Sequence, residues 1–184
     1  MTTTTWPLRW PASAHDVADG IVRLSAALRE SDDTDAVNDA VSELASQNGV
    51  RVEDVYAAIL RMLLEAAHPD GLDGDDVGAV VREAAAKDAG SDPSDVVAVV
   101  LGTLGVHPEP ERRTSGSSAE DESQDPDDRR DDGQVVVARM AAAPAIRASA
   151  AVTEVLLARI GSPIEAVVTM VVDDIAAAET IEWP

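Results

Sequence analysis

The acidic turn at residues 68–76, His-Pro-Asp-Gly-Leu-Asp-Gly-Asp-Asp, comes closest in composition to a metal site. A helix–loop–helix calcium site needs oxygen ligands at alternate positions, a glycine at the sixth and an acid at the twelfth. Counted from Asp70, the third and fifth positions are Leu72 and Gly74, which supply no side-chain ligand. The register that starts at Asp73 places an alanine at the twelfth position. The sequence therefore predicts a polar turn that ends in a helix cap.

Other catalytic and metal-binding patterns are missing from the chain. His15, His68 and His107 are far apart, and none has a second histidine three or four positions on, so no helical zinc site is encoded. The absence of cysteine excludes thiolate metal sites, cysteine nucleophiles and disulfides. No Gly-x-Ser-x-Gly turn and no phosphate loop with a following lysine occur. We expect no catalytic, metal-binding or cofactor-binding residue and no enzymatic activity, with a carboxylate site assembled from facing helices as the remaining enzymatic alternative.

The three tryptophans are the residues that best fit binding of a partner. Trp6, Trp10 and Trp183 all precede proline and lie near the ends of the sequence. Tryptophan buries a large area and is enriched at interaction hot spots. Two alternatives stay open: both ends fold back to fill gaps in a core that has no phenylalanine, or they are linear docking segments for another subunit.

The charge of the chain is strongly acidic, with 35 Asp and Glu against 14 Lys and Arg and a net charge of −21. A cytoplasm at high salt and a GC-rich genome both favour this composition; nucleic-acid mimicry, a basic partner or divalent cations are the alternatives. Direct binding to nucleic acid is not expected, because affinity for phosphates comes from Lys and Arg. With no signal-peptide pattern and no apolar run of about 20 residues, the sequence predicts a cytoplasmic protein and no membrane segment.

Hydrophobic spacing predicts helices throughout the first hundred residues, since apolar residues recur at steps of three and four. The predicted faces are Val17, Ile21, Leu24 and Leu28; Val37, Val41 and Leu44; Val55, Ile59, Met62 and Ala66; and Val77, Val80, Val81 and Ala84. A fifth segment, residues 96–104, is apolar nearly all round, so we expect it to be the buried helix. A β-strand at residues 96–101 is the alternative, because that stretch is rich in β-branched residues.

Residues 108–133 mix proline, glycine, serine and charge with a single apolar residue, Ala119. Such a composition buries too little surface to offset its ordering entropy, so it predicts a disordered acidic linker. The stretch at residues 134–140 fits either a strand or the start of a helix. Two more helices follow, and their small size means that this hairpin should pack on the first helices, on a second copy or on a partner. Their faces are Val152, Val155, Leu156 and Ile160, and Ile164, Val167, Val168, Val171 and Ile175.

A short motif with an acid just before an apolar run recurs along the chain, and we interpret it as helix initiation. Asp92 and Pro93 fit the N-cap and first helical positions, and caps at Ser13, Asp73 and Ser162 use the same device. A longer similarity relates residues 37–60 to residues 77–101, with an offset of about 41 residues. It indicates two related helix–turn–helix hairpins.

These patterns predict an all-α fold. An extended Trp/Pro segment (1–12) precedes a small bundle of helical hairpins (13–107), the acidic linker (108–133) and a C-terminal helical hairpin (134–184). The function that we expect is a non-enzymatic interaction, regulatory or assembly module of an acidic, salt-adapted prokaryotic cytoplasm, with another protein or a second copy as partner. The alternative is a dimeric transcriptional regulator that uses one helix–turn–helix hairpin.

Overall fold

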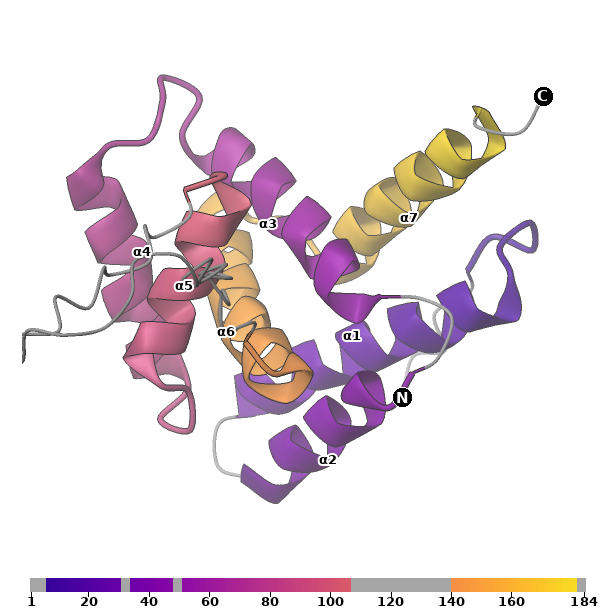
Figure 1. The fold of residues 1–184 in the computed structure, drawn as a ribbon, viewed down its shortest axis with the longest axis horizontal. Coiled ribbons are helices and arrows are strands. Elements are labelled where there is room, and N and C mark those ends of the chain that lie inside the picture. Colours follow the sequence, from indigo (N-terminus) through magenta and orange to yellow (C-terminus); the bar gives the residue numbers. More distant parts are fainter. Residues whose placement is uncertain (1–5, 31–33, 48–50, 107–139, 182–184) are drawn as a thin grey trace, which may run out of the picture. The chain divides into compact units, whose positions relative to one another are not determined.

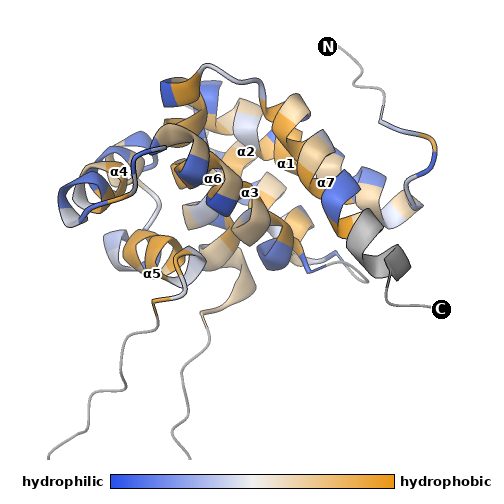
Figure 2. Ribbon diagram, turned by 90° about the horizontal axis from the view of Figure 1, so that it is seen from above, coloured by the Kyte–Doolittle hydropathy of each residue, from blue (hydrophilic) through white to orange (hydrophobic). Residues whose placement is uncertain are grey.

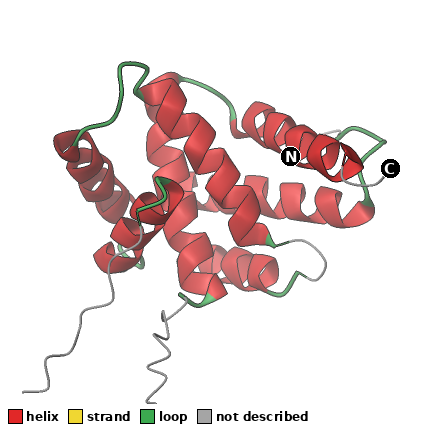
Figure 3. Ribbon diagram, turned by 45° about the horizontal axis from the view of Figure 1, so that its top comes forward, coloured by secondary structure: helices red, strands yellow, loops and turns green. Residues whose placement is uncertain are grey.

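Seven helices make up the described part of the chain in the computed structural model, which covers residues 6–30, 34–47, 51–106 and 140–181. The helices are α1 (Ala12–Glu30), α2 (Thr34–Ala45), α3 (Val52–Ala67), α4 (Gly74–Lys87), α5 (Pro93–Thr103), α6 (Ala142–Ile160) and α7 (Ile164–Ile181). No strand occurs within these ranges, so the all-α prediction is confirmed (Figure 3). The stretch at 96–101 is helical. The predicted linker at 108–133 and most of the stretch at 134–140 lie outside the described residues.

Helix α6 is the centre of the fold, since it packs against α1, α2, α3, α4 and α5 (Figure 1). Every residue from Ala148 to Leu157 is buried, including Ala148, Ala150 and Ala151. Small side chains keep a helix narrow, so that neighbours can approach it from several sides. The predicted C-terminal hairpin is present, and the chain bends by 112° between α6 and α7. The sequence left three packing partners open for this hairpin: the first helices, a second copy or another protein. In the structure, the hairpin contacts the first helices, α1–α5.

The expectation that the fifth helix is the buried one is wrong. Helix α5 buries only Val96, Val100 and Thr103, whereas α6 buries eleven residues. Both helices lack a clear polar face, and hydrophobicity all round a helix does not say which helix the others surround. Tertiary packing determines which of the two helices is surrounded by the others.

The caps of α4 and α5 are confirmed. The Asp73 carboxylate accepts hydrogen bonds from the backbone N–H groups of Asp75 and Asp76, and Asp76 accepts one in return from the N–H of Asp73. Asp92 accepts from the N–H of Ser94 at 2.8 Å, with proline at the first helical position. The acidic turn at residues 68–76 thus ends in a capping box, as predicted.

Two other predicted caps are displaced. Helix α1 already begins at Ala12, where the carbonyl of Pro11 accepts from the N–H of Ala14, so the cap predicted at Ser13 is wrong. Helix α7 begins at Ile164, one residue later than a cap at Ser162 implies.

The two hairpins of the sequence repeat, α2–α3 and α4–α5, do not pack alike. Helix α4 packs on α5, whereas the main contacts of α2 are with α1 and α6. Val37 and Val41 are buried, while the matching Val77 and Val81 are only half-buried. The repeat therefore preserves the order of helices and turns, and the neighbours of each hairpin differ.

No single helix in the described ranges is both long enough and apolar enough to cross a bilayer. Helices α6 and α7 meet the two criteria only when they are taken together, across the bend between them.

Candidate protein-binding surface

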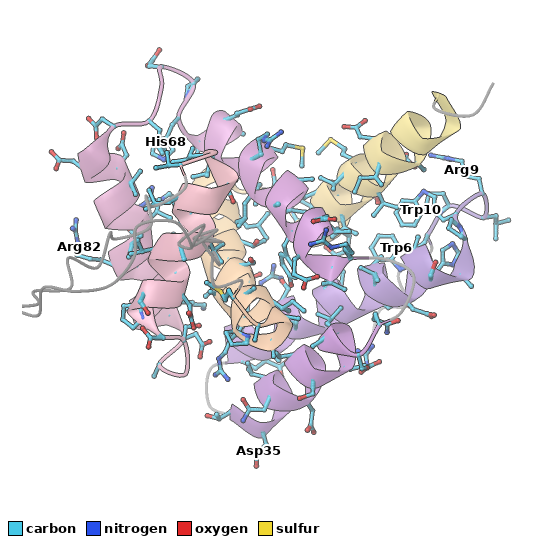
Figure 4. The ribbon with its side chains drawn as sticks, viewed as in Figure 1. Trp6, Arg9, Trp10, Asp35, His68 and Arg82 are labelled. Carbon is cyan, nitrogen blue, oxygen red and sulfur yellow. The ribbon has the colours of Figure 1, made fainter. Side chains whose placement is uncertain are left out.

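Trp6 and Trp10 lie against each other in the structure, near α1 and α7 (Figure 4). Their ring centroids are 5.5 Å apart, and both side chains are buried. The Trp6 indole N–H donates to Asp19 of α1 at 2.6 Å, and the Trp10 indole N–H donates to Asp173 of α7 at 2.7 Å. Each ring thus has an apolar environment and a polar partner, the combination that a buried tryptophan needs.

The segment that carries these tryptophans turns back on itself. The Trp10 backbone N–H donates to the Pro7 carbonyl at 3.1 Å, so the described part of the predicted extended segment contains a turn. Arg9 pairs with Asp173 at 2.5 Å, and only Leu8, at the tip, is almost fully exposed. This geometry supports the alternative in which the N-terminal end fills the core. Docking through Trp6 and Trp10 stays a prediction, and Trp183 lies outside the described residues.

A cleft of about 930 Å³ lies where α1, α4 and α6 end and α7 begins. Its lining includes Arg29, Lys87, Arg159, Glu83 and Glu154. Arg29, Lys87 and Arg159 each lie in the last turn of a helix, where a cation interacts favourably with the helix dipole. Since Arg159 pairs with Glu83 and Arg29 with Glu154, these charges have a structural role that needs no ligand.

Glu154 is a buried carboxylate on α6 that sequence reasoning missed. Arg29 donates to it through Nε at 2.8 Å, and the Ser25 hydroxyl donates to its other oxygen. The neighbouring Tyr56 is also buried; burial, and then the charge of Glu154, raise the pKa of that phenol. The only signal in the sequence was one acid inside the apolar run 152–157. With both oxygens already accepting hydrogen bonds, Glu154 connects α1 to α6.

A second ion pair with a buried carboxylate joins the α4–α5 turn to α6. Arg147 donates through Nε and Nη2 to the two oxygens of Asp88, at 2.6 and 2.8 Å, and through Nη1 to Asn38 of α2. The guanidinium lies so close to Gly90 that a Cβ there would be 3.0 Å from its Nε and closer still to its Cζ and Nη2. Glycine at this position lets the arginine reach Asp88.

The free energy of unfolding should decrease at acid pH, because Asp88 is then protonated. Burial opposes ionisation, but hydrogen bonds from Arg147, Ser91 and the Gly90 N–H outweigh it and lower the pKa of Asp88. The folded state therefore holds this proton less tightly than the unfolded chain, where the pKa is about 3.9. The stabilisation is complete above that value and is lost as the pH falls through the lower, folded pKa.

We expect Asp88→Asn to be less stable than the wild type at pH 7, by an amount that shrinks below pH of about 4. Urea unfolding of both proteins at a series of pH values measures this difference. A difference that is constant with pH would mean that the carboxylate's charge has no part in the effect.

Most of the described basic residues are already paired with acids of the same chain. Arg9, Arg23, Arg29, Arg51, Arg147 and Arg159 all form ion pairs. Within the described ranges, no three His, Asp or Glu side chains are grouped so that they could hold a metal ion. His15 lies beside Trp10, His68 lies 3.5 Å from Asp76, and His107 is outside the described residues. The ion pairs and the spacing of the acids thus leave no metal-binding group among the residues that the structure describes.

The feature that stands out from this acidic surface is the exposed face of α5. Its exposed residues are Pro93, Ser94, Val97, Ala98 and Gly102, followed by Leu104 and Val106. None is charged, and Val97, Leu104 and Val106 are 38%, 42% and 49% exposed. Figure 2 shows α5 coloured largely as hydrophobic, beside an α4 with many hydrophilic positions.

Every other helix exposes at least one charged residue, such as Asp16 (α1), Asp35 (α2), Asp54 (α3), Asp75 (α4), Arg159 (α6) and Asp174 (α7). The apolar surface continues past the C-terminal end of α5 into a hollow of about 390 Å³, lined in part by Leu72 and Leu104, with Arg61 on its wall. The sequence contains a signal for this face, namely the lack of charge after Asp95, but that lack does not distinguish a buried helix from one with an uncovered face.

Comparisons of the chain with protein families, with curated proteins and with solved structures found no match.

Proposed function

We propose that this protein is a non-enzymatic interaction and assembly module of an acidic prokaryotic cytoplasm, and that the exposed face of α5 is its contact surface. One observation carries the proposal: beyond the first turn, which holds Asp95, α5 presents only uncharged residues to solvent in a chain whose net charge is −21. Apolar surface left in contact with water costs free energy, and its concentration on one element is typical of protein–protein contact sites.

The chemistry of this face limits the kind of partner. It offers no charge to select a basic or an acidic ligand, and it is one helix wide. An uncharged, apolar helix fits it best, because two such helices can pack their side-chain ridges into each other's grooves. Loss of charged residues at the centre of a contact is also a general feature of interfaces.

The two alternatives from the sequence have less support. A transcriptional regulator needs basic side chains for phosphates and base edges, and six described arginines are held in ion pairs. A carboxylate metal enzyme needs several convergent acids, whereas Glu154 accepts from Arg29 and Ser25.

A photo-cross-linking amino acid at Val97, introduced in cells at their native salt, tests this proposal. We expect Val97 to give one discrete adduct, identified by mass spectrometry, because the partner covers this side chain. Met170 of α7, 51% exposed, is the matched control and should give no discrete adduct. Equal labelling at both positions, or none at either, would contradict the proposal.

A further inference from the structure

The imidazole of His68 has an unusual feature: its Nε2 is buried and has no hydrogen-bond partner among the described residues. His68 caps the C-terminal end of α3, and its side chain is 11% exposed (Figure 4). Buried polar atoms in folded proteins are nearly always hydrogen-bonded, because an unpaired one has lost its water without compensation. A partner for Nε2 should therefore come from outside the part of the chain that the structure describes.

The other ring nitrogen of His68 indicates what kind of group Nε2 needs. Its Nδ1 lies 3.5 Å from Oδ2 of Asp76. A carboxylate at this place favours a proton on Nδ1, so that in the neutral ring Nε2 carries a lone pair and accepts a hydrogen bond. The group that completes the site is therefore a donor, such as a hydroxyl or an N–H.

His68 lines the hollow of about 390 Å³ at the C-terminal ends of α3 and α5. The apolar part of its wall comes from Leu64, Leu72 and Leu104. A volume of this size and an apolar wall with few polar groups are typical of small-molecule sites. Leu72 and Leu104 are both partly exposed, so their side chains have room to turn aside and let a bound group reach Nε2.

The remaining polar residues of the wall favour an uncharged occupant. Arg61 and Glu65, four positions apart on α3, both line the hollow, so their charges balance. The Thr103 hydroxyl donates to the Val99 carbonyl at 2.9 Å and is thus already used as a donor. No group of acids and histidines that could hold a metal ion occurs in the described ranges, so the occupant is not expected to be a metal.

We infer that this hollow binds a small, neutral, mostly apolar molecule whose single hydroxyl or N–H donates to Nε2 of His68. The inference goes beyond the proposed function, because it concerns a ligand and not a protein partner. It needs neither Val97 nor the exposed face of α5, so the two can fail separately.

Phenol and toluene are a matched pair of probes, since they share a ring and differ by a hydroxyl in place of a methyl group. We expect titration calorimetry of the purified full-length chain to give a Kd of about 1 mM for phenol. Toluene should bind about fivefold more weakly, because it cannot donate to Nε2. Equal affinities for the two probes would overturn the role of His68.

Two substitutions of His68 separate the hydrogen bond from the shape of the hollow. His68→Leu removes the acceptor and should abolish the preference for phenol over toluene. His68→Gln places an amide oxygen near the position of Nε2 and should keep that preference. Circular dichroism checks that both variants are folded. A preference that persists in His68→Leu would overturn the inference.

The ¹⁵N NMR signals of the imidazole rings report the contact directly. The chain has three histidines, and the signals that disappear in His68→Gln are those of His68. Phenol should shift the Nε2 signal of His68 and leave the other two rings unchanged. An Nε2 signal that phenol does not shift would mean that water or another part of the chain pairs with this atom, which would overturn the inference. If neither probe binds at concentrations up to about 5 mM while Val97 still cross-links to a partner in cells, this inference fails and the proposed function stands.

Discussion

Replacing Trp10 with alanine should lower the free energy of unfolding by about 3–5 kcal/mol, the usual cost of removing a large buried aromatic side chain. Trp10 is 5% exposed, stacks on Trp6 and donates to Asp173. The substitution removes the contacts of Trp10 with Trp6, with His15 of α1 and with Asp173 of α7, and it leaves Asp173 with Arg9 as its remaining described partner. Urea unfolding followed by circular dichroism, at fixed NaCl concentration, measures the change. Urea is preferable to guanidinium chloride, which is a salt and would change the ionic strength during the titration.

Leu8→Ala is the matched control for Trp10→Ala. Leu8 lies in the same turn and is 95% exposed, so its loss should change the free energy of unfolding by less than about 0.5 kcal/mol. The pair separates the two roles that the sequence leaves open for the tryptophans. If Trp10→Ala were as stable as Leu8→Ala, the N-terminal segment would not be part of the core, and docking would become the better explanation.

Leu156→Ala should destabilise the protein by about 2–5 kcal/mol, because it opens a cavity in the central helix. Leu156 has no exposed surface, and α6 packs against five other helices, so few neighbours are free to move into the space. The same urea titration measures the change, with the slope against urea showing whether unfolding stays a single transition.

A substitution on α5 provides the comparison for Leu156→Ala. Val97→Ala removes two methyl groups from an exposed site on the helix that the sequence predicts to be the buried one. It should change the free energy of unfolding by less than about 0.5 kcal/mol. A larger loss from Val97→Ala than from Leu156→Ala would mean that α5, and not α6, is the core helix.

The sequence by itself determined the helices and several of their starts. Apolar residues at steps of three and four identify the core faces of α1 and α2 and most of that of α3. Ile21, Val41 and Ile59 are buried, whereas Ala66, predicted on the α3 face, is exposed. The caps at Asp73 and Asp92 are equally readable, since a cap joins residues two or three positions apart. These features depend on local geometry, which the order of residues specifies directly.

Only the tertiary structure decided which helix lies at the centre and which residues meet. Trp10 and Asp173 are separated by 163 positions, and Ser25 and Glu154 by 129, so no local pattern relates them. Periodicity shows that a helix has an apolar face, but not whether a neighbour covers it. Helices α5 and α6 both look apolar in sequence, yet α6 became the core because its small side chains admit neighbours on every side. Helix α5 kept an uncovered face because α3, α4 and α6 cover only one side of it.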